Sequence, residues 1–96
     1  MRKSNTEHIQ AVVDDYLKSL GIYHKVREYR VIREWEKLMG QTISKSIVKS
    51  YIKDRKFFIY TKSSVVRNEL FMIREGIKDK MNELAGMQLV DDVILK

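Results

Sequence analysis

The residues that could perform catalysis are few, and their spacing does not suit it. His8 and His24 lie far apart, and neither has a cysteine or a second histidine at metal-ligand spacing. Asp91 and Asp92 are adjacent, so in a strand they point to opposite faces and cannot share a proton or a magnesium ion. The sequence also contains no glycine-rich phosphate loop and no nucleophile elbow. We therefore expect no enzyme activity, no metal ion, no cofactor and no small-molecule substrate.

Positive charge is concentrated in the middle of the chain. The net charge is +6, and residues 25–62 hold eleven basic and four acidic residues. The segments before and after this stretch are close to neutral. A local excess of this kind favours a polyanionic partner, with nucleic acid as the first hypothesis. A basic composition without any specific partner is the alternative.

Alternating residues in this basic segment predict a β-hairpin. The runs SIVKSYIK and KFFIYTK have a period of two and are joined by Asp54 and Arg55. If Phe57 and Ile59 face the core, the residues between them face water, another layer or a ligand. On single-stranded nucleic acid, lysines would neutralise phosphates and aromatic rings would stack on bases, whereas helices covering this face are the alternative. The candidate residues are Lys49, Tyr51, Lys53, Lys56, Phe58, Tyr60 and Lys62.

Two further basic stripes are predicted on helices. One would add phosphate contacts from a helix over residues 24–39, although Glu34 could neutralise part of it. The second stripe puts a phenylalanine among cations, and such a patch suits a protein partner or a phosphate backbone. Alternatively, Glu75 pairs with Lys78 and the phenylalanine packs against the helix over residues 24–39. The first stripe is Arg30, Arg33 and Lys37, and the second is Arg67, Phe71, Arg74 and Lys78.

Apolar spacing and glycines define the elements that would position these residues. Helices are predicted over residues 6–20, 24–39 and 64–85, each followed by a glycine that suits a helix end. Ser63 and Ser64 would cap the third helix. Gly76 inside that helix costs about 1 kcal/mol relative to alanine and suggests close approach of a neighbouring element. The third helix carries one continuous apolar stripe, Val66, Leu70, Ile73, Ile77, Met81 and Leu84, and residues 88–96 read as a third strand.

The length and composition predict one α+β domain over residues 1–96, with residues 1–5 as a flexible N-terminal segment. A chain of 96 residues with 44% hydrophobic content suffices for one modest core. The expected order is α-α-β-β-α-β, with a three-stranded sheet packed against helices. There is no cysteine for a disulfide or a thiolate site. No apolar run approaches the length of a membrane span, so we expect a cytoplasmic protein without a membrane partner.

Several stretches together resemble the DciA-like family of bacterial proteins, long catalogued as a domain of unknown function. They are Trp35 followed by EKLMG, then Ile43, the hairpin, SSVVRNEL, MNELAG and LVDDVIL, and the resemblance covers residues 9–95. It implies a KH-like fold, DNA affinity and a role at the replicative DNA helicase, whose loading onto single strands such proteins assist. The residues that carry the family motif, most of them structural, are Trp35, Gly40, Ser63, Ser64, Glu69, Leu70 and Asn82.

The chain departs from true KH domains at the loop that binds nucleic acid. Gly40 is followed by Gln41, Thr42 and Ile43, so the GXXG backbone clamp is absent there. The hairpin also lacks the glycine often found after its acidic turn residue.

The sequence hypothesis is a non-enzymatic, nucleic-acid-binding accessory protein that binds single-stranded DNA and assists the replicative helicase. Both the hairpin residues and the stripe on residues 24–39 would contact nucleic acid. The stripe on the third helix would contact a protein partner. Two alternatives stay open, namely an interaction adaptor whose basic surface accepts an acidic partner, and a module associated with RNA or the ribosome.

Overall fold

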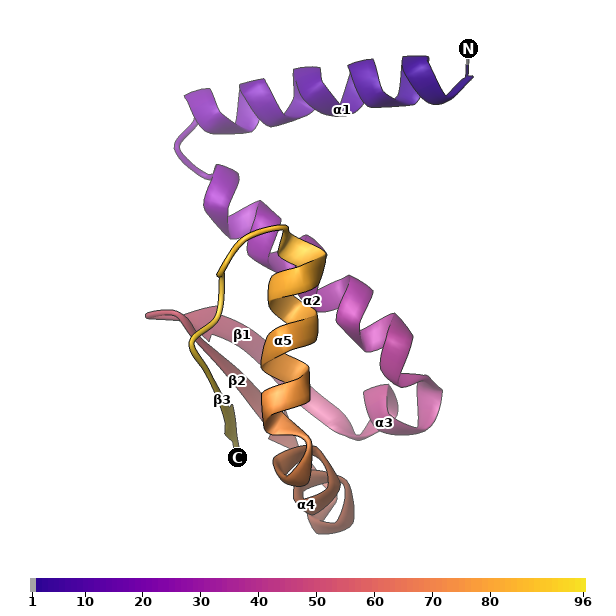
Figure 1. The fold of residues 1–96 in the computed structure, drawn as a ribbon, viewed down its shortest axis with the longest axis vertical. Helices are drawn as coiled ribbons and strands as arrows, with labels where there is room; N and C mark the ends of the chain where they lie inside the picture. Colours follow the sequence, from indigo (N-terminus) through magenta and orange to yellow (C-terminus); the bar gives the residue numbers. More distant parts are fainter. Residues whose placement is uncertain (1) are drawn as a thin grey trace.

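A three-stranded sheet packed against helices forms the fold (Figure 1). The computed structural model describes the backbone of residues 2–96 and the side chains of residues 8–96. The predicted α+β class is confirmed, and the predicted order is retained with two changes, a short helix after Gly40 and a third helix that is divided in two. In chain order the elements are α1 (Arg2–Ser19), α2 (Tyr23–Met39), α3 (Gln41–Ser46), β1 (Ile47–Lys53), β2 (Lys56–Thr61), α4 (Ser64–Met72), α5 (Arg74–Ala85) and β3 (Asp92–Leu95).

Strand β2 lies at the centre of a mixed sheet. It pairs antiparallel with β1, where Ile52 is opposite Phe57, and parallel with β3, where Phe57 is beside Val93. These three side chains are buried on the face that we call the inner face. Because side chains alternate along a strand, the residues between them point to the opposite, outer face.

The predicted hairpin and its two-residue turn are confirmed. Asp54 and Arg55 have φ values of 53° and 63°, so both occupy the left-handed region. Turns of this kind match the twist of the two strands, but their second position usually holds glycine. The chain therefore keeps an arginine where backbone geometry favours a residue without a side chain.

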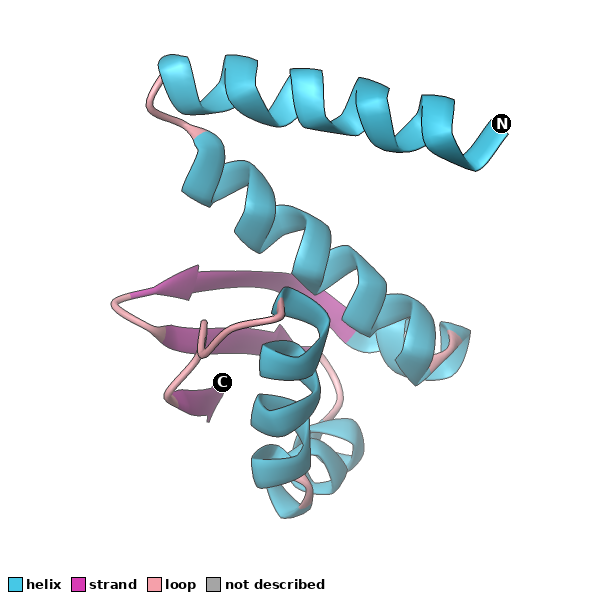
Figure 2. Ribbon diagram, turned by 45° about the horizontal axis from the view of Figure 1, so that its top comes forward, coloured by secondary structure: helices cyan, strands magenta, loops and turns pink. Residues whose placement is uncertain are grey.

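Helices α2 and α5 cover the inner face of the sheet (Figure 2). Trp35 on α2 is fully buried and meets Phe57 edge to face, with 5.2 Å between ring centroids. Ile77 and Met81 on α5 are buried in the same cluster. The indole N–H of Trp35 has no hydrogen-bond acceptor among the side chains and backbone that the structure describes. Arg27 on α2 also donates a hydrogen bond to the Ala85 carbonyl, which ties the two helices together.

The prediction of one continuous helix over residues 64–85 is wrong, because the chain turns a corner at Ile73. Its backbone leaves helical geometry at φ −110° and ψ 20°, and its side chain is 48% exposed. Val66 and Leu70 before the corner and Ile77 after it are buried. The break allows α4 to contact the sheet while α5 packs along α2.

One of the two serines that the sequence predicts as caps, Ser63, caps the start of α4. The Ser63 hydroxyl accepts a hydrogen bond from the backbone N–H of Val66 at 3.2 Å, while Ser64 is the first helical residue. This bond satisfies one of the N–H groups that have no partner inside the helix. The hydroxyl therefore has a structural role at this junction.

The prediction that a neighbouring element approaches Gly76 closely is also wrong. A Cβ atom added there would meet no atom within 4 Å, and the φ of Gly76 is not positive. Gly76 instead lies beside a shallow apolar hollow of about 250 Å³ between α2 and α5. The glycine is therefore not required by packing in this chain.

Strand β3 is shorter than predicted because Asn82 captures the residues before it. The Asn82 side-chain oxygen accepts the N–H groups of Leu89 and Val90, each at 2.8 Å. Its amide nitrogen donates to the Val90 carbonyl at 3.0 Å. These bonds hold Val90 in the core, fully buried, and the strand begins only at Asp92.

Helix α1 lies apart from the sheet and meets the rest of the chain at the start of α2 (Figure 1). It begins at Arg2, inside the segment that the sequence predicted to be flexible. Gly21, with φ 75°, follows its end and allows the sharp turn into α2. No helix in the described chain combines the length and the apolar character needed to cross a membrane.

Candidate nucleic-acid interface

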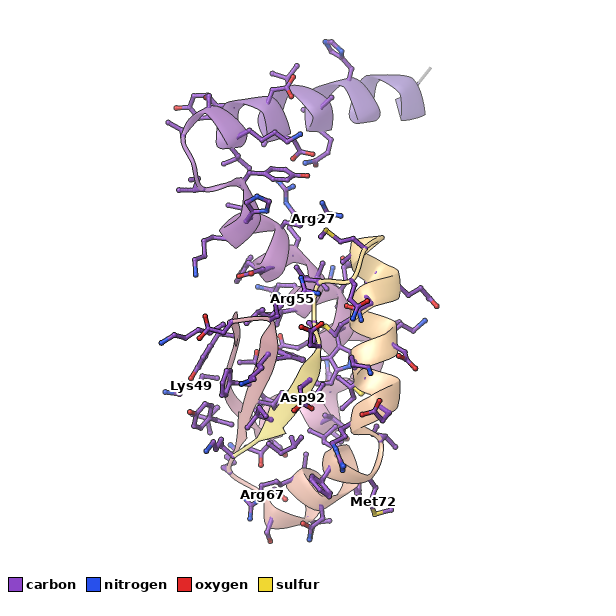
Figure 3. All side chains as sticks on the ribbon, turned by 60° about the vertical axis from the view of Figure 1, so that its left-hand side comes forward. Arg27, Lys49, Arg55, Arg67, Met72 and Asp92 are labelled. Carbon is purple, nitrogen blue, oxygen red and sulfur yellow. The ribbon has the colours of Figure 1, made fainter. Side chains whose placement is uncertain are left out.

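Six of the seven hairpin residues predicted to bind nucleic acid lie on the outer face of the sheet, and the seventh, Lys62, directly follows the end of β2. The register places Tyr51 opposite Phe58 and Lys49 opposite Tyr60. Lys49 lies on the side of the sheet away from α5 (Figure 3). No helix within residues 2–96 covers this face, so the alternative that helices bury it is wrong for the described chain (Figure 2). The residues are Lys49, Tyr51, Lys53, Lys56, Phe58, Tyr60 and Lys62.

Three aromatic rings form a strip on this face. The Tyr51 ring stacks on Phe58 with 5.1 Å between centroids and an interplanar angle of 21°, and on Tyr60 at 6.1 Å and 25°. The Tyr51 and Tyr60 hydroxyls are 3.3 Å apart, and this hydrogen bond is the main cause that raises the pKa of Tyr51. All three side chains are half-buried. Contacts between the rings therefore fix their orientation while part of each remains open to solvent.

The lysines around this strip form no ion pair with a carboxylate of residues 8–96, although Asp92 lies beside Lys56 in the register of β2 and β3. Lys49 places its ammonium nitrogen 4.5 Å from the Tyr60 ring centroid. Lys53 and Lys56 are directly opposite across the hairpin, where like charges disfavour the pairing. Among residues 8–96, no carboxylate forms an ion pair with these three residues or with Lys62. An anionic ligand would relieve the repulsion between them.

The predicted stripe on α2 lies in a different layer and is largely neutralised. Arg30 forms an ion pair with Asp14 of α1 at 2.9 Å, and this hydrogen bond is the main cause that lowers the pKa of Asp14. The predicted partner Glu34 instead contacts Lys37, at 3.5 Å. Arg33 donates to the Tyr29 hydroxyl at 2.8 Å. Because α2 covers the inner face, the structure does not bring Arg30, Arg33 and Lys37 onto the outer face with the hairpin residues.

Arg33 and Lys37 do line a second, polar hollow. It has a volume of about 340 Å³ and is bordered by Gly40, Gln41 and the start of α3. Glu36 also lines it and accepts a hydrogen bond from Ser50 of β1 at 3.3 Å. The positive charge in this hollow is therefore offset by a carboxylate.

The predicted partner stripe forms an exposed patch where α4 meets α5. We define the α4–α5 corner as Arg67, Phe71, Met72, Ile73 and Arg74. Phe71 is 51% exposed, so the alternative that it packs against α2 is wrong. The Arg74 guanidinium lies 4.1 Å from its ring centroid. Arg67 and Met72 project from the same end of the molecule (Figure 3).

Lys78 is set apart from this corner. It forms an ion pair with Glu75 at 2.9 Å, as the alternative interpretation of the sequence expected. This hydrogen bond is the main cause that raises the pKa of Lys78. Its positive charge is therefore largely offset by Glu75 on the same helix.

Sequence reasoning missed two exposed residues of the corner. Met72 is 80% exposed but belonged to no predicted stripe, and Ile73 was assigned to the buried stripe. No proline or glycine occupies position 73, so the local sequence gave no sign of the break. Only packing against α2 and the sheet reveals it.

Comparison with known proteins identifies a family. The family model described as "Dna[CI] antecedent, DciA" matches residues 8–95. This family is associated with loading of the replicative DNA helicase. Neither the curated proteins nor the solved structures compared with the chain gave a match.

Proposed function

Because the chain belongs to the DciA family, we propose that it is a non-enzymatic accessory protein of the replicative DNA helicase that binds single-stranded DNA on the outer face of its sheet. The observation that carries the DNA-binding part is the aromatic strip surrounded by lysines that form no ion pair with a carboxylate of residues 8–96. The α4–α5 corner would contact the helicase. DNA and helicase would thus occupy different surfaces of one small domain.

The chemistry of the outer face favours a single strand over a duplex. Aromatic rings stack on bases only where the bases are unpaired, and each stacked base contributes about 1–3 kcal/mol. Tyr51, Phe58 and Tyr60 form a continuous strip, so consecutive bases could be accommodated along it. Phosphates at the edges of the strip would meet Lys49 and Lys53 on β1, Lys56 on β2, and Lys62 just after β2.

The test is the salt dependence of binding to a fluorescent oligonucleotide. If the four lysines each neutralise one phosphate of a single strand, the slope of log affinity against log salt should be about −3. Substituting Lys49→Gln and Lys53→Gln together should reduce the magnitude of that slope by about 1.4. The matched control is Lys80→Gln, which removes a lysine on α5 that already pairs with Glu83 at 2.8 Å. A slope near zero would refute DNA binding through these lysines.

The second candidate function is a protein-interaction adaptor that does not bind DNA. The exposed Phe71, Met72 and Ile73 between two arginines favour it, because this combination suits an acidic segment with apolar side chains. Capture of purified replicative helicase by the wild type and by Phe71→Ala separates the two functions. Loss of capture together with an absence of any oligonucleotide binding by the wild type would support the adaptor alone.

An RNA ligand would use the same stacking and charge chemistry. The titration therefore includes competition between DNA and RNA oligonucleotides of the same sequence. Stronger displacement by RNA would replace single-stranded DNA with RNA as the ligand of the outer face. Equal displacement would indicate that the 2′-hydroxyl is not contacted.

A further inference from the structure

Helix α1 carries an apolar stripe that no other described residue covers. Ile9, Val13, Tyr16 and Leu20 recur at spacings of four, three and four residues, with Val12 beside them. These five side chains are between 39% and 64% exposed. A spacing that alternates between four and three is the pattern with which two helices pack along a shared seam. The stripe thus has the form of a helix-packing surface without its partner.

The stripe is not the side of α1 that meets α2. That contact is made by Asp14, which pairs with Arg30, and by Lys18, whose ammonium lies 4.8 Å from the Tyr23 ring. The half-buried Leu17 lies between them in sequence on the same side. Helices whose apolar face stays in water are only marginally stable, because most helix stability in proteins comes from packing that face. The apolar stripe is therefore available for a contact outside the chain.

We propose that α1 is a self-association surface, on which α1 of a second copy packs antiparallel. In that arrangement Ile9 of each copy lies opposite Leu20 of the other, and Val13 lies opposite Tyr16. Every residue of the seam then meets an apolar residue. The arrangement has two-fold symmetry, so it closes as a dimer and does not extend into a filament.

The distribution of charge favours a second copy at α1. The seam contains no charged residue, and residues 8–20 carry only Lys18 against Asp14 and Asp15. The other exposed apolar patch, the α4–α5 corner, is flanked by Arg67 and Arg74, so two copies would repel each other there. Helix α1 also lies at the end of the molecule opposite to that corner (Figure 1).

The same charges favour the antiparallel direction. Two parallel helices would bring both domains to the same end of the pair, with their lysine-rich outer faces near each other. Antiparallel helices send the two domains to opposite ends and oppose the two helix dipoles. Five side chains from each copy, each about half exposed, would bury on the order of 1,000 Å² in total, which is at the lower limit for a specific interface. We therefore expect a weak, concentration-dependent dimer.

Sedimentation of the full chain over a range of concentrations tests the proposal. The mass should rise from 11.4 kDa toward twice that value as concentration increases. Val13→Glu should hold the protein at the monomer mass. The matched control is Ala11→Glu, which adds the same charge about 160° around the helix and should leave association unchanged. Circular dichroism checks that both variants fold, as expected because both positions are exposed.

Disulfide trapping tests the direction of the helices. Because the chain contains no cysteine, only the introduced thiols can react. A mixture of Ile9→Cys and Leu20→Cys copies should form a mixed disulfide dimer. Ile9→Cys alone should not, because its two thiols would be about 16 Å apart along the antiparallel pair. A self-disulfide of Ile9→Cys would overturn the antiparallel arrangement. A wild-type mass of 11.4 kDa at every concentration, or association that Val13→Glu does not change, would overturn the proposal.

This inference is independent of the proposed function. Val13 lies on α1, whereas the proposed DNA contacts lie on β1 and β2. The affinity of each domain for a short oligonucleotide should therefore be the same in Val13→Glu and wild type. A failure of self-association leaves the DNA titration unaffected, and the reverse also holds.

Discussion

Arg55 holds Asp91 with both its side chain and its backbone. Its Nε and Nη2 atoms donate to the two carboxylate oxygens of Asp91 at 2.8 and 3.0 Å. Its carbonyl oxygen accepts the N–H of Asp91 at 2.7 Å. The turn of the hairpin is thereby fastened to the residue that precedes β3. This contact explains why an arginine occupies a position whose φ of 63° favours glycine.

Replacing Arg55 should separate the stabilising effect of its side-chain contact from the destabilising effect of its left-handed backbone. Arg55→Ala removes the side-chain contact and keeps an L-residue in the left-handed region, so the free energy of unfolding should fall. Arg55→Gly removes the same contact but relieves the backbone, so it should be more stable than Arg55→Ala. Urea denaturation followed by circular dichroism measures both. If Arg55→Ala is as stable as Arg55→Gly or more stable, the left-handed backbone at position 55 does not destabilise the turn.

The contact also predicts a pH dependence. The hydrogen bond from Arg55 is the main cause that lowers the pKa of Asp91 below its ordinary value. A carboxyl whose pKa is lower in the folded state stabilises the fold above its unfolded-state pKa and loses that effect as pH falls through the folded value. The stability difference between wild type and Asp91→Asn should therefore be present at neutral pH and shrink in acid. A difference that is the same at both pH values would contradict the role of the charge.

Trp35 should tolerate phenylalanine far better than alanine. Trp35→Ala leaves a cavity against Phe57 and should lower the free energy of unfolding by about 3–5 kcal/mol. Trp35→Phe keeps a ring and removes an indole N–H that has no acceptor among the described residues, so its cost should stay below about 1.5 kcal/mol. Since Trp35 is the one tryptophan, far-UV circular dichroism rather than fluorescence follows unfolding. A cost of Trp35→Phe close to that of Trp35→Ala would contradict this prediction.

Gly76→Ala should stabilise the protein. The position lies inside α5, its φ is not positive, and an added Cβ meets no atom within 4 Å. Alanine at such a site raises the free energy of unfolding by about 0.4–1 kcal/mol. The control is Gly86→Ala, where φ is 70° and the substitution should destabilise. Thermal unfolding of both variants checks the opposite signs, and a loss of stability in Gly76→Ala would show a neighbour at that site.

Tyr51 is the central ring of the aromatic strip, so it should dominate base stacking. Tyr51→Leu keeps a strand-compatible apolar side chain but removes the ring, and it should weaken oligonucleotide binding by about 1–3 kcal/mol. Tyr51→Phe should bind almost as well as wild type. Tyr16→Leu removes an exposed tyrosine from α1, which carries none of the proposed DNA contacts, and serves as the control. Equal affinities of Tyr51→Leu and wild type would exclude stacking on this ring.

The hairpin was predictable because its signal is local. A period of two over KFFIYTK fixes which residues share a face, and the register follows from a two-residue connection. The placement of Lys49, Tyr51 and Phe58 on one face was therefore correct before any tertiary information. The alternation alone did not show that helices cover only the inner face.

The α4–α5 corner was not predictable because its cause is tertiary. Apolar residues continue at helical spacing through Ile73, so local propensity favours an unbroken helix. The break is favoured by burial of Val66 and Leu70 against the sheet and of Ile77 against α2, contacts that lie far away in sequence. The pairing of Arg30 with Asp14 has the same origin, since it depends on how α1 turns at Gly21.

The order in which the sheet is assembled follows from the central position of β2. The β1–β2 hairpin can form early, since only two residues separate its strands, but the parallel partner β3 must wait until α4 and α5 are in place. During that interval the backbone of β2 beside Phe57 and Ile59 is an open edge that another unfinished chain could pair with. We expect the Arg55 and Asn82 contacts to shorten this interval. Losing either contact should therefore lower the yield of refolding, even where the folded protein remains stable.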